Sequence, residues 1–464
     1  MIKIGFVPSH RVPFNRDWAV EMRKRTIKSI KENVGEAEFV YPDEGLTDGG
    51  LVTNEEDAQK AVKLFKENNI QGLIIGTMTF GEELPNITIA EAFDKIPILI
   101  FGTKEGPFTS DGNRKSDSFC GTISTASGLT RRKIKFDFGG IYFPEEEDFI
   151  SDVKRFVRVS MAYSGFMGAR VGLVGPRPAP FETCAINEAN LIEKFRQRVV
   201  SINLLKLYSD INAMKTDSRV TEAVNEVKKS YDCHLASDNT LFKIVKLELV
   251  LSDYAQKEGL SGYGIQCWTS MQEEIGISPC MSMGRLTDKG IMCACEVDMH
   301  GVLTMIAQYL LSLKETVPHF IDWTIQNQDD EDTLFAWHCG NAPVSLKCAS
   351  CKPLVNSHST LGEKLGYDKS FGTAEFQLKE GKVTIARLVE YDGKFKMLIT
   401  KGDAIPDSRS LRGCWKWIKV SNLKTLYRTI IEEGFTHHAS LIFGDYEKEL
   451  AAFCKFAGIE VVNV

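Results

Sequence analysis

Two acidic residues follow short apolar runs in the middle of the sequence, and they are the first candidates for chemistry. Glu296 closes the run GIMCACE, and Asp322 closes TVPHFID. A carboxylate at the C-terminal tip of a buried strand occupies the usual functional position in an α/β sheet. Asp322 lies 26 residues after Glu296, which leaves room for one helix, Val302 to Lys314. Two neighbouring strands are therefore expected to present both carboxylates together, although an isolated acid after a strand more often caps a helix or turn.

Histidines supply a second kind of candidate. His338 lies in FAWHCGNAP, where a strand is expected to give way to an abrupt turn beside a metal-capable side chain. His437 and His438 lie in GFTHHASLIFG and enter an apolar strand, so alternation should send one ring to each side and only one into a given pocket. A lone histidine is more often a satisfied core or surface group, but two acids nearby favour a site.

The cysteines suggest weaker alternatives. Cys348 and Cys351 form a CxxC pair, with His338 and Cys339 upstream, and such a set is one possible structural zinc site. Cys293 and Cys295 share one face of a strand and are expected to pack in the core. Neither GxGxxG after a strand nor a Walker lysine motif occurs, so no nucleotide cofactor is expected.

Composition narrows the class of protein. The 464 residues are 43% hydrophobic and 25% charged, which is typical of a globular chain of two or three domains. A net charge of -6 gives no attraction for nucleic acid or anionic membrane. No apolar run reaches the roughly 18 residues that span a bilayer, and the first residues lack the pattern of a signal peptide. We expect a cytoplasmic protein whose twelve cysteines are mostly reduced.

The elements that must position these residues follow a repeating pattern. Short Val and Ile runs alternate with helical stretches such as Trp18 to Glu32 and Asn54 to Asn68, which is a βαβ rhythm. A second start at ARVGLVGPRPAP is followed by a predicted helix from Cys184 to Val199, the apolar run INLLKLY, and long helices between Arg219 and Lys257. Such runs suit parallel strands buried on both faces.

Beyond residue 330 the sequence pattern changes to short alternating apolar runs. KVTIARLVEY and KFKMLITKG are joined by YDGK, in which Asp392 and Gly393 are a hairpin signal. The tail returns to a helix (Leu423 to Glu433), the strand-like HHASLIFG, a helix (Tyr446 to Ala457) and IEVVNV. We therefore predict an α/β protein with two Rossmann-like, doubly wound parallel-sheet domains followed by a mainly β, barrel-like C-terminal domain. The predicted ranges are 1–168, 169–320 and 321–464.

With these motifs in view, the chain resembles the superfamily of L-fucose isomerase and L-arabinose isomerase over essentially its whole length. The tail GFTHHASLIFGDYEKELAAFCKFAGIEVV looks like that family's histidine strand, helix and final strand. ACEVDMHGVLTM and VPHFIDW look like the segments that hold its two metal carboxylates. The resemblance implies Glu296, Asp322 and His438 as metal ligands. His338 falls where arabinose isomerases carry a further metal histidine, so its role is to bind metal or sugar.

The resemblance also suggests secondary positions around the sugar. SGYGIQCW looks like a substrate-side loop, EGKVTIARL like a strand of the family's β domain, and IGTMTFGEE like a loop that reaches a neighbouring subunit's site. The substrate-binding candidates are Gln266, His338, Arg387, His437, Trp415 and Arg11. Fucose isomerases are longer and carry tryptophan where this chain has MTF, so the identity of the sugar does not transfer.

The activity that the resemblance implies is interconversion of an aldose and its ketose through a cis-enediol. Glu296 and Asp322 would act as base and acid, and a divalent cation, Mn²⁺ or in its place Mg²⁺ or Co²⁺, would bind the sugar oxygens. The substrate would be a pentose or a deoxyhexose or hexose of carbohydrate catabolism, with a modified or anionic sugar conceivable. Two alternatives are a metal-dependent epimerase or lyase and a non-catalytic sugar-binding protein. The implied assembly is a homo-oligomer, with a hexamer favoured and sites at subunit interfaces.

Overall fold

The computed structural model describes all residues from 1 to 464, and they form two compact units. The first unit comprises residues 1–164 with 452–457, and the second comprises 165–451 with 458–464. None of the helices combines the length and the apolar character needed to cross a membrane. The central and C-terminal parts of the chain share one unit, so this division does not separate the domains predicted on either side of residue 320. The boundaries at 168 and 320 stay predictions.

The first unit is built around a five-stranded parallel sheet in the order β2-β1-β3-β4-β5. Its strands are β1 (Ile2–Ser9), β2 (Ala37–Val40), β3 (Gly72–Thr77), β4 (Ile98–Thr103) and β5 (Asp137–Tyr142). Its helices are α1 (Arg16–Asn33), α2 (Glu55–Asn68), α3 (Glu83–Ala92), α4 (Ser118–Arg131) and α5 (Glu147–Phe166), the last of which also contributes residues to the second unit.

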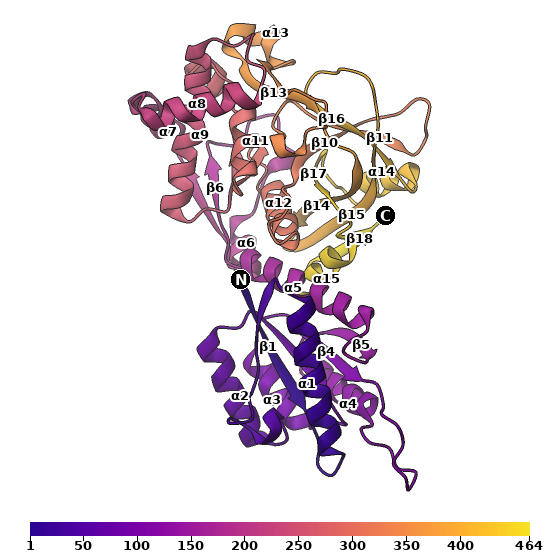
Figure 1. The fold of residues 1–464 in the computed structure, drawn as a ribbon. Coiled ribbons are helices and arrows are strands. Elements are labelled where there is room, and N and C mark those ends of the chain that lie inside the picture. The colour runs from indigo at the N-terminus through magenta and orange to yellow at the C-terminus, as the bar shows by residue number, and fades with distance from the viewer. The chain divides into compact units, whose positions relative to one another are not determined.

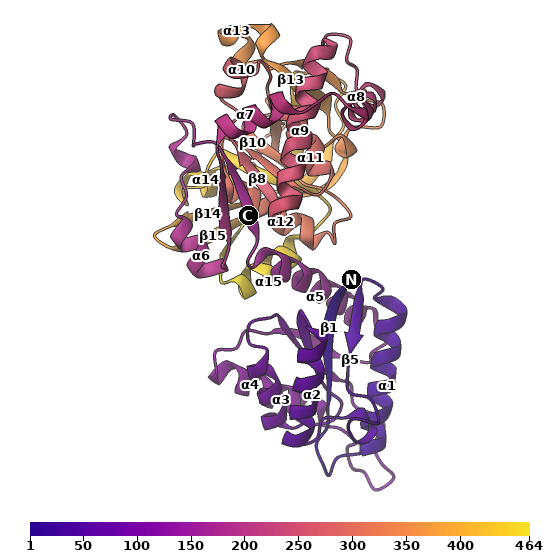
Figure 2. The ribbon, with the colours of Figure 1, turned by 90° about the vertical axis from the view of Figure 1, so that its left-hand side faces the viewer.

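Both faces of this sheet are covered, as the continuous Val and Ile runs predicted. Ile98 and Ile100 of β4 pack with residues of α2, α3 and α4 in one apolar core. Phe101 points to the opposite face and meets Phe149 of α5, with ring centroids 4.9 Å apart. α1 lies on the other side of the sheet from α2 and α3 (Figure 2). The doubly wound arrangement follows from strands that alternate buried side chains to both faces.

The second unit contains a smaller parallel sheet and a large, mostly antiparallel one (Figure 1). The parallel sheet has the order β7-β6-β8-β9, from β6 (Arg170–Val174), β7 (Arg198–Ile202), β8 (Gly262–Ile265) and β9 (Met292–Cys295). Its helices are α6 (Glu188–Phe195), α7 (Leu204–Ala213), α8 (Ser218–Ser230), α9 (Asp238–Glu258), α10 (Ser270–Glu274), α11 (Cys280–Asp288) and α12 (Met299–Leu311).

The antiparallel part forms a closed ring of strands. Its sheet has the order β12-β13-β16-β11-β10-β17-β14-β15-β18, and β15 also pairs with β16, so six of the nine strands close a barrel. The strands are β10 (His319–Gln326), β11 (Thr333–His338), β12 (Leu354–Ser357), β13 (Phe371–Gln377), β14 (Gly381–Tyr391), β15 (Lys394–Ile405), β16 (Cys414–Val420), β17 (His438–Phe443) and β18 (Glu460–Asn463). The remaining helices are α13 (Leu361–Leu365), α14 (Leu423–Glu432) and α15 (Glu447–Ala457). The predicted fold class is confirmed.

Two local predictions were wrong. The helix expected from Cys184 to Val199 is only α6, because Asn187 caps it by accepting from the amides of Ala189 and Asn190, and Arg196 ends it in a left-handed conformation. Val199, Val200 and Ile202 then form β7, so the run INLLKLY is mostly helix α7. Asp322 does not close its strand either. It lies in the middle of β10, which continues to Gln326.

α12 connects the two sheets of the second unit. The helix contacts β6, β8 and β9 of the parallel sheet as well as β10, β14 and β17 of the barrel. Gln308 donates to the carbonyls of Thr384 and Ser440, and the hydroxyl of Thr304 accepts from the amide of Leu388. The end of β9 that leads into α12 is therefore held against the barrel. Glu296, Asp322 and His438 lie at this junction.

Candidate metal centre

Three of the predicted ligands converge at the junction of the parallel sheet and the barrel. His438 Nε2 lies 3.3 Å from Glu296 Oε2 and 3.6 Å from Asp322 Oδ1. Each of these three atoms is buried without a hydrogen-bond partner. The prediction that two neighbouring strands present both carboxylates was wrong: Glu296 follows β9 of the parallel sheet, and Asp322 lies on β10 of the barrel. Asp322 is instead the direct cross-strand partner of His438 in β17, so both side chains share one face.

The backbone around Glu296 explains how its carboxylate reaches this point. β9 is fully buried, and the next two residues, Glu296 and Val297, have φ of 57° and 61°. Non-glycine residues rarely adopt this left-handed region, which costs about 1–2 kcal/mol each. The chain thus turns sharply at the tip of the strand. Asp298 then begins α12 by accepting from the amide of Gly301 at 2.8 Å. Strain of this kind gathers where surrounding structure demands a particular side-chain direction.

Asp298 orients the candidate imidazole ligand. Its Oδ2 accepts from His438 Nδ1 at 2.8 Å, and both of its oxygens accept from the guanidinium of Arg387. All three side chains are at most 1% exposed. Because His438 donates from Nδ1, its Nε2 carries a free lone pair that points toward Glu296 and Asp322. This carboxylate–histidine arrangement is the one that commonly supports a metal ligand.

The two candidate carboxylates differ in acidity. Burial alone would raise the pKa of Glu296, but contacts with His437 and His438 outweigh it and hold the pKa below the usual value. Burial raises the pKa of Asp322 to about 6, against the opposing effect of the same two histidines. The pKa of Asp298 is strongly depressed despite its burial, because Arg387 and His438 stabilise its charge. Such a split in carboxylate pKa values is typical of acid–base pairs.

His338 stands beside these residues at the end of β11. A ring nitrogen of His338, a carboxylate oxygen of Asp322 and a ring nitrogen of His438 all lie within 4.8 Å of one another. The predicted turn after it is present, since β11 ends at His338 and Gly340 has φ of 140°. Its Nδ1 accepts from the amide of Cys339 at 2.9 Å. His338 therefore lies at the site.

A wall of rings continues away from Glu296. His437 Nε2 lies 3.8 Å from Glu296 Oε2, and its ring stacks on Phe181 at 6.3 Å. Phe181 meets Trp268 at 5.8 Å, and Trp268 meets His358 edge to face at 5.9 Å. Both His437 and His438 reach Glu296, so the expectation that only one of them faces the pocket was wrong. His437 lies before β17 begins, so the alternation of side chains along that strand does not determine which way its ring points.

The other four residues predicted to bind the sugar do not gather in one place. Gln266 follows β8 directly, next to the end of β9 where Glu296 stands, and its Oε1 is buried without a partner. Arg387 is engaged behind the site with Asp298. Trp415 is 1% exposed and packs with Phe335 and Trp417. Arg11 belongs to the first unit, where its guanidinium lies 4.2 Å from the ring centre of Phe80.

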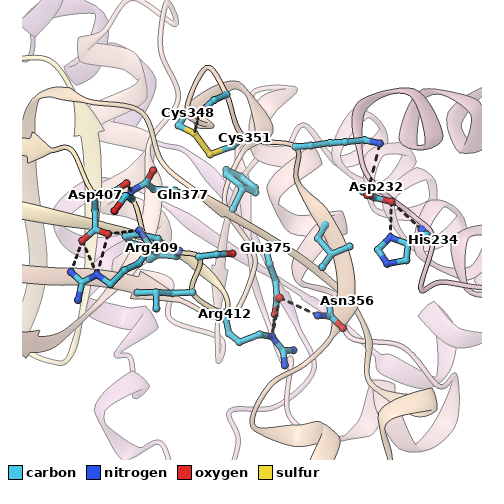
Figure 3. Close-up of a pocket in the computed structure, with 18 residues that line it drawn as sticks. Asp232, His234, Cys348, Cys351, Asn356, Glu375, Gln377, Asp407, Arg409 and Arg412 are labelled. Carbon is cyan, nitrogen blue, oxygen red and sulfur yellow. Dashed lines mark hydrogen bonds and ion pairs between the residues drawn. A yellow bond between two sulfur atoms is a disulfide. The ribbon is translucent and has the colours of Figure 1, made fainter.

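A cavity of about 640 Å³ lies elsewhere in the second unit (Figure 3). Cys348 and Cys351 form a disulfide at its edge, so the zinc site considered for this pair is not formed. Arg409 pairs with Asp407, and Arg412 pairs with Glu375 within the same cavity (Figure 3). The other ten cysteines are free, and Cys293 and Cys295 are buried, as expected.

Sequence reasoning missed several residues of the site. Asp298 had a local signal, because it starts a helix two residues after Glu296, in CEVD. Cys184, whose Sγ lies 3.9 Å from His438 Nδ1, had none. Phe181, Trp268 and His358 come from three separate loops and carried no shared pattern.

The donor set fits a divalent cation. Glu296, Asp322 and His438 offer carboxylate oxygens and an imidazole nitrogen whose facing atoms have no partner in the protein. Oxygen and imidazole ligands suit ions such as Mn²⁺ and Mg²⁺.

Comparison with known proteins agrees with this geometry. Residues 5–167 match the model for the N-terminal domain of fucose/sulfoquinovose isomerase, and residues 336–464 match that for the C-terminal domain of L-fucose isomerase. A sulfoquinovose isomerase of Priestia aryabhattai is 23% identical over 98% of this chain and 97% of its own length. One of Alkalicoccus urumqiensis is 24% identical over the full length of both chains, and one of Clostridium sp. (strain MSTE9) is 25% identical over 84% of this chain and 85% of its own.

These relatives are isomerases, which favours the isomerase over the epimerase, lyase and binding-protein alternatives. The two domain models cover most of the first unit and the part of the barrel from residue 336 onward, which includes His438. The chain belongs to the L-fucose isomerase family and is an isomerase that interconverts the aldose and ketose forms of a sugar.

Proposed function

We propose that this isomerase depends on a divalent cation held by Glu296, Asp322 and His438, and that its substrate is sulfoquinovose or a closely similar anionic sugar. The observation that supports the metal is the convergence of three unpartnered, buried ligand atoms: Glu296 Oε2 and Asp322 Oδ1 lie 3.3 Å and 3.6 Å from His438 Nε2. The observation that supports the sugar is that relatives similar to 84% to 100% of this chain are sulfoquinovose isomerases.

The reaction moves the hydrogen of C2 to C1 and the hydrogen of O2 to O1. Glu296 is held ionised and takes the C2 proton, and the electrons of that bond form the C1–C2 double bond of the enediol. A bound divalent cation supplies polarisation of the carbonyl and charge stabilisation at the two oxygens. Asp322, whose Oδ1 lies 3.6 Å from His438 Nε2, is the second carboxylate and delivers a proton to C1.

The remaining steps balance the protons. The O2 hydrogen passes to O1, and O2 becomes the ketone oxygen. Glu296 then holds one proton more and Asp322 one fewer, and exchange with water restores both. The rings of Phe181, Trp268 and His437 contact one another beside Glu296 and line one side of the site.

Metal removal tests the first half of the proposal. Enzyme treated with a chelator should lose isomerisation, and Mn²⁺ should restore it. Glu296→Gln should bind Mn²⁺ weakly in a calorimetric titration, whereas Glu375→Gln, a comparably buried carboxylate that pairs with Arg412, should bind it as the parent does. Full turnover after chelation would refute the metal dependence.

A substrate panel tests the second half. Sulfoquinovose should be isomerised with a kcat/KM about 10- to 100-fold above that for D-glucose, which carries a hydroxyl in place of the sulfonate, because one charge-assisted contact contributes about 1.5–3 kcal/mol. In heavy water, proton NMR should show deuterium at C1 of the ketose. Equal turnover of glucose, L-fucose and sulfoquinovose would remove the case for an anionic substrate.

A further inference from the structure

Two histidines of the site have a tautomer that the backbone determines. The Nδ1 of His338 accepts from the amide of Cys339 at 2.9 Å, and the Nδ1 of His358 accepts from the amides of Thr360 and Leu361 at 3.2 Å each. A backbone amide can only donate, so each Nδ1 must present its lone pair. The single hydrogen of each neutral ring therefore sits on Nε2.

His438 has the opposite arrangement. Its Nδ1 faces the carboxylate of Asp298, which can only accept, so the hydrogen sits on Nδ1 and the lone pair on Nε2. A metal needs that lone pair. His338 could offer Nε2 to a cation only by losing the bond from Cys339 or by giving up its last ring proton. The rings of His338 and His438 have centroids 6.2 Å apart. His338 thus offers an N–H donor at Nε2, and His438 offers a lone pair at Nε2.

The Nε2–H of His338 is free to donate to a substrate oxygen. His338 Nε2 and Asp322 Oδ1 are both buried without a partner, and a ring nitrogen of His338 lies within 4.8 Å of a carboxylate oxygen of Asp322. A single oxygen atom about 2.8 Å from each group fits a separation of that size. A sugar hydroxyl or carbonyl oxygen can accept from His338, and a hydroxyl can also donate to Asp322.

His358 occupies the far end of the ring wall. It is 2% exposed, and its edge-to-face contact with Trp268 places it in line with Phe181 and His437. Burial and the charge of Arg412 lower the pKa of His358 to about 4, so the ring is neutral near neutral pH. No described contact uses its Nε2.

We infer that His338 and His358 are a pair of neutral Nε2–H donors that bind oxygens of the substrate, with His338 at the reacting end and His358 farther along the wall, and that neither is a metal ligand. The inference rests on the proposed function, because it assigns these donors to the sugar of the same site. On its position alone, His338 would be counted among the metal ligands. The inference assigns it to the sugar instead.

Paired variants separate donor from ligand. His338→Gln places an amide N–H near the position of Nε2, and His338→Leu removes the donor. Both should bind Mn²⁺ in a calorimetric titration with the parent's affinity. His338→Leu should lose about 100-fold in kcat, as expected for one lost donor to a reacting oxygen, and His338→Gln should recover most of it. For His358 the leucine variant should raise KM, and the glutamine variant should restore it.

A spectroscopic reading makes the test independent of turnover. With ¹⁵N-histidine, the signals of His338 and His358, assigned by their loss in the matching glutamine variants, should show the Nε2–H tautomer both without metal and with Mg²⁺. His234→Leu, at an exposed histidine, should change neither metal affinity nor rate. A drop of Mn²⁺ affinity in His338→Gln as large as in His438→Gln, or a tautomer that changes on metal binding, would overturn the inference. Failure of the parent enzyme to bind Mn²⁺ would instead contradict the proposed function and leave the tautomers measurable.

Discussion

Asp298 holds two positively polarised groups at once, the ring of His438 and the guanidinium of Arg387, at the centre of the second unit. The strand-end position of Glu296 and the tail motif around His438 could be read from the sequence, because each depends on residues next to it. The partnership with Arg387 could not, because 89 residues separate the two side chains and only the folded barrel brings them together. The same is true of the amide that directs His338.

Asp298→Asn should weaken both metal binding and the fold. The asparagine can still accept from His438, but it leaves the buried charge of Arg387 unpaired, which costs about 3–5 kcal/mol. Loss of such an outer partner lowers metal affinity about 10- to 100-fold. Adding Arg387→Met should recover much of the unfolding free energy without restoring Mn²⁺ affinity. Titration calorimetry and urea unfolding of the single and double variants check this, and an Mn²⁺ affinity unchanged in Asp298→Asn would contradict it.

His319 makes stability depend on acid. Its ring is fully buried with both nitrogens unpartnered, and burial lowers its pKa to about 3. The unfolded chain binds a proton near pH 6.5 while the folded chain does not, so stability is lost as pH falls from about 6.5 toward 3. His319→Leu should remove this loss, worth about 2 kcal/mol at pH 5 relative to pH 8. Urea unfolding of metal-free protein at the two pH values measures it, and an equal pH slope in both proteins would count against it.

The hairpin of β14 and β15 shows what local sequence can predict about an element. Asp392 and Gly393 join strands of 11 and 12 residues, and both have positive φ, at 52° and 75°. The turn signal is local and strong, so the hairpin was predicted correctly. The position of Asp322 within β10 was not, because polar residues after Ile321 look like a strand end until pairing with β11 extends the strand. Long-range pairing also decided where α6 gives way to β7.

Gly393→Ala should destabilise the barrel through its backbone alone. An added Cβ would meet no atom closer than 3.8 Å, so crowding is absent and only the left-handed conformation is penalised. The expected loss is about 1–2 kcal/mol in the unfolding free energy of the second unit. Asp392→Gly removes the cost of the left-handed conformation at the preceding residue, so it should be neutral or stabilising. Thermal unfolding of both variants tests this, and a neutral Gly393→Ala would show that the turn changes type at no cost.

At the scale of the whole molecule, the predicted fold class was confirmed because its two signals are both periodic. Buried Val and Ile runs separated by helices indicated parallel sheets, and alternating runs with a tight turn indicated the β-rich part. Barrel closure through β15 and β16 and the placement of α12 between two sheets had no such signal, since both depend on contacts among distant segments. Within the second unit, Glu296 comes from the parallel sheet, and Asp322 and His438 come from the barrel.

Bound cation should therefore stabilise the second unit selectively. At about 100 times its Kd, Mn²⁺ should add about 2.7 kcal/mol to the unfolding free energy of the unit that holds the ligands. Hydrogen exchange should slow in peptides from β9, β10 and β17 and stay unchanged in β1 to β5. His438→Gln should abolish the effect. Equal protection of the first unit, or protection that survives in the variant, would contradict a site confined to these strands.

The distance along the chain between Asp298 and His438 has a consequence for biosynthesis. These partners are 140 residues apart, and β14, β15 and β16 are made between them. A ribosome exposes both proposed carboxylate ligands before it makes the imidazole that would complete the set. For the proposed cation centre, ion capture would then follow assembly of the barrel, so the finished fold, and not the nascent chain, would select the metal.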